Sequence, residues 1–238
     1  MRGGSWLSTP VIVTSLDPGS HTDSEIWESV EIVYLDDEGR SKAMASVFQP
    51  DARLAERMAE PGMAGEPDLD LRLRALGAVP VHVLTLRVDL AGHFDREVRV
   101  LDIRPVILER IPPLNGTLFS VPPQAGTPAM DMTFDMDELS PTARESGQGT
   151  PFFEKQSISL TDKQQETITI RTFAEQYCVT FFLRMKYLVG DEVKEKDLYG
   201  QGQPFRVTGL SRDMRYRRAF AVIGDSLQQA PDPAALQS

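Results

Sequence analysis

The chain has 238 residues, of which 41% are hydrophobic and 25% are charged, and this is enough for one large or two small cores. Its 25 basic and 35 acidic side chains give a formal net charge of −10, which repels nucleic-acid phosphate and excludes nucleic acid as a main partner. The single cysteine, Cys178, excludes an intramolecular disulfide, and no run approaches the roughly 20 apolar residues of a membrane helix.

The first quarter of the chain is predicted to hold strands and one helix. Asp51 precedes an apolar-periodic stretch and is a typical N-cap, so a helix is expected over 52–59, ended by Pro61 and Gly62. A polar loop is expected over 62–70. The expected strands, the last two joined by a hairpin turn at 36–39, are 11–14, 29–35 and 43–48.

From Val79 onward the apolar residues recur with a period of two, as in half-buried strands. One apolar face is formed by His82, Leu84, Leu86, Val88 and Leu90. In the next stretch the apolar phase changes from Val98 and Val100 to Leu101 and Ile103, which predicts a β-bulge. Pro105 indicates an edge or irregular position in the same strand.

Further strands are predicted down to residue 208, and the strongest covers 177–189, where every second residue is apolar. Many short strands with few helices predict an all-β, mainly antiparallel, immunoglobulin-like β-sandwich with a smaller N-terminal strand-and-helix segment. We expect three regions: 1–76 as that N-terminal segment packed on the main domain, 77–210 as the sandwich, and 211–238 as a last strand and a frayed tail.

The motifs of catalysis and cofactor binding are missing from the sequence. It has no Gly-x-Ser-x-Gly elbow, no Walker loop, and no Gly-x-Gly-x-x-Gly after a strand. The three histidines are scattered, and Cys178 lies in an apolar strand without a nearby histidine, which predicts a buried thiol. We therefore predict no catalytic residue, no cofactor and no enzymatic activity.

An acidic run is the best remaining chemical candidate. Asp131, Asp135 and Asp137 fall on one face of an expected strand, with methionine and phenylalanine on the other. Three carboxylates in a row present the hard oxygen ligands that Ca²⁺ prefers. Because no glycine turn wraps them, we interpret them first as a solvated strip, and keep them as a weak metal-site candidate.

The stretch from residue 98 to 209 resembles actinobacterial membrane-anchored proteins with a β-rich extracytoplasmic domain. The resemblance rests on five short motifs in order: Pro113–Phe119, Pro122–Gly126, Phe134–Asp137, Tyr177-Cys178 and Pro204–Gly209. In that family one membrane helix precedes the ectodomain. The resemblance therefore implies an N-terminal anchor that this chain lacks, and it transfers no activity and no functional residue.

These observations lead to one functional hypothesis and two alternatives. We expect a non-enzymatic extracytoplasmic binding or assembly module of the cell envelope, with a protein partner and with membrane contact only through the missing anchor. Binding is expected to use the Pro-rich region 111–126 or the loop 140–151. The alternatives are a hydrolase of glycans or esters on a β scaffold, and a Ca²⁺- or carbohydrate-binding accessory module. A cytoplasmic location is the alternative to the extracytoplasmic one.

Overall fold

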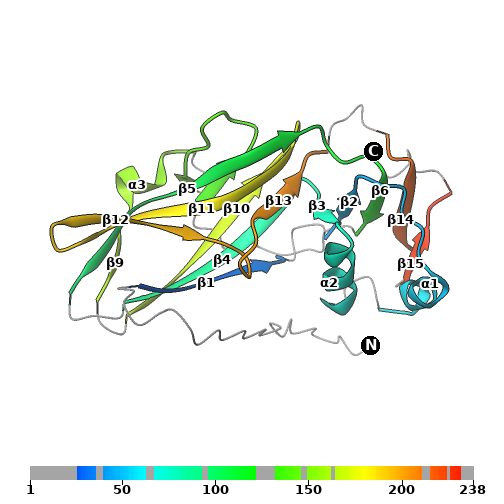
Figure 1. Cartoon of the computed structure of the whole chain (residues 1–238), viewed down its shortest axis with the longest axis horizontal. Coiled ribbons are helices and arrows are strands. Elements are labelled where there is room, and N and C mark those ends of the chain that lie inside the picture. Colours follow the sequence, from blue (N-terminus) through cyan, green and yellow to red (C-terminus); the bar gives the residue numbers. More distant parts are fainter. Residues whose placement is uncertain are drawn as a thin grey trace, which may run out of the picture.

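The described part of the chain is mainly β-structure. The computed structural model describes residues 26–35, 40–62, 67–92, 96–121, 132–145, 149–161, 164–210, 215–223 and 226–231. Its strands form three mainly antiparallel sheets, and two helices lie beside the third sheet at one end of the molecule (Figure 1). The prediction of a mainly antiparallel all-β protein is confirmed at this level.

The first sheet has five strands in the order β1-β4-β10-β7-β8. Neighbours are antiparallel except β7 and β10, which run parallel. The strands are β1 (Ile26–Val33), β4 (Val83–Gly92), β10 (Gln165–Phe173), β7 (Met132–Asp135) and β8 (Arg144–Glu145).

The second sheet is built around the long pair β5 and β11. Its order is β12-β11-β5-β9, and β13 pairs with the start of β11 beside β12. The strands are β5 (Val98–Ile111), β9 (Ile158–Leu160), β11 (Cys178–Val189), β12 (Glu192–Leu198) and β13 (Phe205–Thr208). The short helix α3 (Phe152–Lys155) precedes β9.

The first two sheets enclose one hydrophobic core. Leu86, Val88 and Leu90 of β4 are fully buried in it, together with Phe181 and Leu183 of β11. The predicted period-two faces are thus confirmed from Leu84 to Leu90 and from Val179 to Val189, whereas Tyr177, at the start of the predicted 177–189 strand, precedes β11 and is 39% exposed. Lys196 of β12 donates to the Ile26 carbonyl of β1 at 3.2 Å. This hydrogen bond connects an edge strand of the second sheet to an edge strand of the first.

His82 does not belong to the apolar face predicted for it. It precedes β4, has a left-handed φ of 68°, and is only partly buried. Its backbone donates to the Thr208 carbonyl at 2.8 Å and accepts from the Ala174 amide at 2.9 Å. Strand periodicity therefore begins only at Val83, because these contacts bend the backbone one residue earlier.

The bulge predicted near Leu101 is present. The register between β5 and β11 shifts where Lys186 pairs with Asp102 while Tyr187 pairs with Val100. Pro105 lies beyond residues 98–100, the part of β5 that pairs with β9. At Pro105, among the described residues, β5 therefore pairs on one side only, with β11. A residue without an amide hydrogen is tolerated there.

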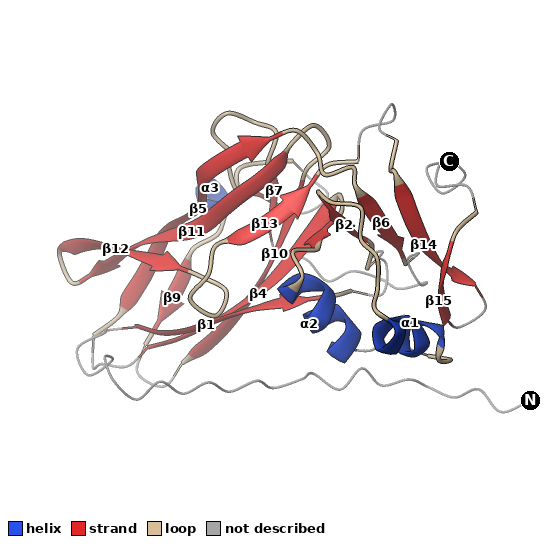
Figure 2. Cartoon of the chain, turned by 45° about the vertical axis from the view of Figure 1, so that its right-hand side comes forward, coloured by secondary structure: helices blue, strands red, loops and turns tan. Residues whose placement is uncertain are grey.

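The third sheet lies at the end of the molecule that also carries α1 and α2 (Figure 2). Phe119 stacks on Phe220 with ring centroids 5.3 Å apart and meets Phe48 edge-on at 5.6 Å. The elements, in spatial order, are β15 (Ser226–Gln229), β14 (Arg218–Ile223), β6 (Thr117–Ser120), β2 (Lys42–Met44) and β3 (Val79–Pro80), with α1 (Ala52–Ala59) and α2 (Pro67–Ala75).

Helix α1 confirms the capping prediction, since the Asp51 carboxylate accepts from the Leu54 amide at 2.8 Å. Three expectations are wrong. Residues 67–70 of the loop expected over 62–70 belong to helix α2. The C-terminal region holds the two strands β14 and β15 rather than one. The expected hairpin, whose turn at 36–39 lies outside the described residues, is contradicted because β1 and β2 pair in different sheets.

The sheets draw strands from across the expected segment boundaries at 76 and 210. Strand β1 joins the first sheet, while β6 joins the third. A small cluster that includes Ile111, Leu118, Cys178 and Ala219 packs the end of the second sheet against the third. The division into three segments stays a prediction about folding units.

Candidate binding surface

The outer face of the second sheet carries the most distinctive group of exposed side chains. On β11 the odd-numbered residues from Val179 to Val189 enter the shared core. The even-numbered residues therefore point outward, because successive side chains of a strand alternate. Along β11 these are Thr180, Phe182, Arg184, Lys186 and Leu188.

Three cations occupy successive levels of this face. Arg99 lies opposite Leu188, Lys186 lies opposite Asp102, and Arg104 lies opposite Arg184. The levels are two residues apart on β11, or about 6.6 Å each. All three cations are exposed, and none has an ion pair within the described part of the chain. We call Arg99, Lys186 and Arg104 the cationic strip.

Arg184 lies beside the strip but is already neutralised. Its guanidinium donates to both carboxylate oxygens of Asp197 at 2.6 and 2.9 Å, and Glu195 is 3.8 Å away. These hydrogen bonds raise the pKa of Arg184. The carbon of the same guanidinium lies 5.4 Å from the centre of the Phe182 ring. Arg184 is therefore held in place, and the three strip cations remain available to a ligand.

Asp102 and Glu195 are the acidic cross-strand neighbours of Lys186, one on each side. Burial raises the pKa of Asp102, while Arg104 and Lys186 act in the opposite direction. Neither acid comes within ion-pair distance of Lys186 among the described residues. A partly desolvated carboxylate that is not paired costs free energy, so Asp102 opposes stability while it limits the positive charge of the strip.

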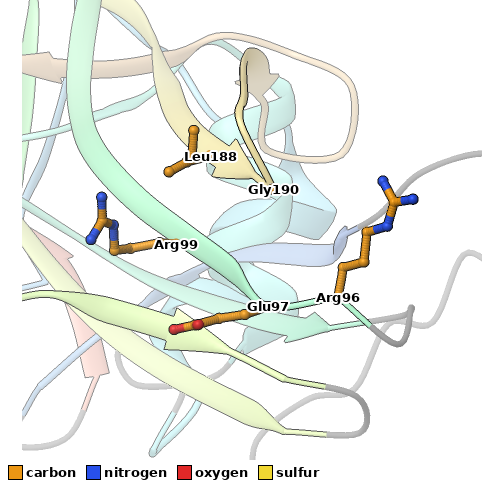
Figure 3. A pocket seen from close by; sticks show the side chains of 5 residues that line it. All are labelled: Arg96, Glu97, Arg99, Leu188 and Gly190. Carbon is orange, nitrogen blue, oxygen red and sulfur yellow. The ribbon is translucent and has the colours of Figure 1, made fainter.

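A shallow cavity of about 360 Å³ opens at the Arg99 end of the strip. Arg99 and Leu188 line it from the paired strands β5 and β11, and Arg96 and Glu97 line it just before β5 (Figure 3). Gly190 completes the lining. It has a φ of 63° in the two-residue turn to β12, where glycine is favoured. The lining carries two guanidinium groups and one carboxylate, a net formal charge of +1, and the side chains of Arg96 and Arg99 point to different sides (Figure 3). The cavity is therefore weakly attractive to anions.

The opposite end of the strip is apolar. Phe182 stacks on Tyr199 with ring centroids 5.1 Å apart. Tyr199 is 37% exposed, and Leu108 at a second bulge of β5 is 55% exposed. The face thus combines a row of cations with an exposed aromatic edge, a composition typical of protein interfaces.

The acidic run is divided by the structure. Asp131 lies outside the described residues. Asp135 accepts the Asp137 amide at 2.9 Å, and the Asp137 carboxylate accepts the amides of Glu175 and Gln176 at 2.8 and 3.1 Å. Asp137 thus fixes the turn between β10 and β11. Where side chains are described, no group of three or more metal-binding residues converges.

Replacing Asp137 with alanine should lower stability by about 0.5–2 kcal/mol, because two backbone amides lose their charged acceptor. Chemical denaturation measures this loss. Glu56→Ala is the matched control, since Glu56 is exposed in the middle of α1 and alanine suits a helix. Equal stability of the two variants would contradict the anchoring role of Asp137.

A buried ionic cluster joins three elements, and sequence reasoning missed it. Lys42 of β2 is 3% exposed and forms an ion pair with Asp70 of α2. The Tyr34 hydroxyl, just after β1, donates to Asp70 at 3.0 Å, and the Lys42 ammonium lies 4.8 Å from the centre of its ring. Burial lowers the pKa of Lys42 and raises that of Tyr34. Because Lys42 and the Tyr34 hydroxyl both have Asp70 as their partner inside the cluster, we interpret it as structural.

Other predicted positions fall in different places. Cys178 is buried as expected, and burial raises the pKa of its thiol while Arg206 opposes the shift. Several predicted positions lie outside the described residues: His21, His93, residues 122–126 of the Pro-rich region and residues 146–148 of the second loop. The cationic strip was not predicted, because its members are separated by about 80 residues in sequence.

Together these features define a mainly-β protein with a two-sheet core, a third sheet, and a cationic and aromatic outer face. No protein-family model matches the chain, and a search of curated proteins finds no match. Among the residues described, none of the helices has both the length and the apolar character that a membrane span requires.

Proposed function

We propose that this protein is a non-enzymatic binding or assembly module that docks a protein partner on the outer face of its second sheet. The cationic strip carries the proposal. In a chain with a formal charge of −10, three exposed cations at successive levels stay free of ion pairs, although nearby acids such as Glu195 are present. An unpaired cationic row on an acidic protein favours a complementary partner.

The location and the detailed fold belong to the same proposal. The module is extracytoplasmic, belongs to the cell envelope, and is natively tethered by an N-terminal membrane helix, as the resemblance over residues 98–209 implies. Its two-sheet core is an immunoglobulin-like sandwich to which the third sheet has been added. The common core between the inner faces of the first two sheets supports the sandwich. Lys196 of the edge strand β12 donates to the Ile26 carbonyl of the edge strand β1, and lysine is a residue that natural sheets place at exposed edges.

Protease treatment of intact cells that produce the full-length native protein tests the location. We expect the protein to sediment with the membranes and to be cut by protease added outside. A protein that stays in the soluble fraction and is protected would overturn the envelope proposal, and attention would turn to cytoplasmic complexes.

Cross-linking on the same cells tests the docking face. The variant Arg104→Glu/Lys186→Glu should lose a cross-linked partner that the natural protein retains. The control Arg53→Glu/Arg72→Glu makes the same change in charge on exposed positions of α1 and α2. Retention of every cross-link in the strip variant, or equal loss in both variants, would contradict the proposed surface.

A further inference from the structure

We propose, building on the proposed function, that the cationic strip binds an extended acidic segment of the partner, with carboxylates on alternate residues. The inference adds the chemistry and the conformation of the ligand to the docking face. It rests on the spacing of Arg99, Lys186 and Arg104, on the cavity beyond Arg99, and on the aromatic pair at the other end.

The spacing of the cations matches an extended chain. Side chains on the same side of a strand repeat about every 6.6 Å, which is the separation of successive strip levels. The three levels therefore span about 13 Å from Arg99 to Arg104. An extended segment with acids at positions i, i+2 and i+4 places one carboxylate over each cation.

A helical ligand fits less well. Its acids share one face at positions i, i+4 and i+7, which span about 10.5 Å along the axis. That is about one-fifth shorter than the strip. An acidic helix therefore matches the spacing of the three cations less closely than the extended segment does.

The two ends of the strip define what flanks the acidic residues. At one end, the cavity lined by Arg96, Glu97 and Arg99 has a net formal charge of +1, which favours an acidic continuation of the segment over a basic one. At the other end, the exposed ring of Tyr199, stacked on Phe182, suits an apolar or aromatic side chain. The preferred ligand thus has its apolar residue at the Arg104 end and its acids toward Arg99.

Asp102 sets an upper limit on the attraction. It is the cross-strand partner of Lys186, is partly buried, and lies between the levels of Arg99 and Arg104. Converting it to asparagine removes a negative charge from the middle of the strip and nearly preserves the side-chain volume. The strip should then bind an acidic segment more tightly, which gives the proposal a gain-of-binding test.

The test uses two synthetic peptides of the same composition, titrated into the whole chain at low ionic strength. One has tyrosine followed by three glutamates alternating with threonine, and the other has tyrosine followed by three threonines and then three glutamates. We expect the alternating peptide to bind about fivefold tighter. Lys186→Glu should weaken the binding of the alternating peptide about tenfold, and Asp102→Asn should tighten it about threefold. Added salt should weaken the binding of this peptide to the natural chain and to both variants.

Other results separate this inference from the proposed function. Equal affinity of the two peptides, or no effect of Lys186→Glu, overturns the extended-segment proposal, while loss of the cellular cross-link in the strip variant would still support docking. Vesicles containing anionic lipid serve as a further probe. Binding that depends on Lys186 for vesicles but not for the alternating peptide also overturns the inference, since the ligand would then be a membrane surface.

Discussion

Replacing Asp70 with alanine is expected to lower the free energy of unfolding by about 3–5 kcal/mol, the cost of leaving a buried charge without its partner. Lys42 is only 3% exposed, and Asp70 is its ion-pair partner in the cluster. The substitution also removes the acceptor of the Tyr34 hydroxyl. Alanine favours helix, so the loss does not come from α2 itself. Urea denaturation at pH 7 measures the effect.

Two variants control this prediction. The double change Lys42→Met/Asp70→Leu removes both charges and should recover most of the stability, because well-packed apolar residues replace a buried ion pair at little cost. Arg74→Ala should have a small effect, since Arg74 is 26% exposed and 3.9 Å from Asp70. If Asp70→Ala and Arg74→Ala were equally stable, the cluster would be marginal to the fold.

The pH dependence of the stability of the Asp70→Ala variant is a second, independent test of the cluster. Burial lowers the pKa of Lys42, and Asp70 is the main opposing influence. Without Asp70 the folded state holds the Lys42 proton less tightly than the unfolded state, so the unfolded chain binds more protons. Stability of the variant should therefore rise, relative to the natural protein, as the pH increases from neutral toward the ordinary lysine pKa. A falling difference would contradict this account.

Replacing Phe119 with alanine is the second change expected to have a large effect, about 3–5 kcal/mol. Phe119 is 1% exposed and lies between Phe48 and Phe220 in the core of the third sheet. We also expect a single unfolding transition. The third sheet shares a buried cluster with Ile111 and Cys178 of the second sheet, and β3 runs almost directly into β4.

Phe119→Leu is the matched control and should cost less, because leucine refills most of the space. Calorimetry and denaturation monitored by two probes distinguish one transition from two. If Phe119→Ala lowered only the first of two transitions, the third sheet would be a separate folding unit. A loss below about 1 kcal/mol would contradict the description of the aromatic cluster as a core.

Local patterns in the sequence predicted the parts of this fold that depend on neighbouring residues. The cap by Asp51 involves an amide only three residues away, and the alternation of Leu84 through Leu90 reports one buried face of one strand. The phase change at Leu101 predicted a bulge because it is visible within five residues. Helix α2 was missed, since its start at Pro67 follows a polar stretch that is also typical of loops.

By itself, the sequence determined that this is an acidic, mainly antiparallel β protein with a buried cysteine and a capped helix over 52–59. Only the tertiary structure decided that β1 and β2 join different sheets, that Lys42 meets Asp70, and that Arg99, Lys186 and Arg104 form a row. The physical reason is the same in each case. Strand pairing between distant segments sets these neighbours, and a period of two indicates which face a residue occupies but not which strand lies beside it.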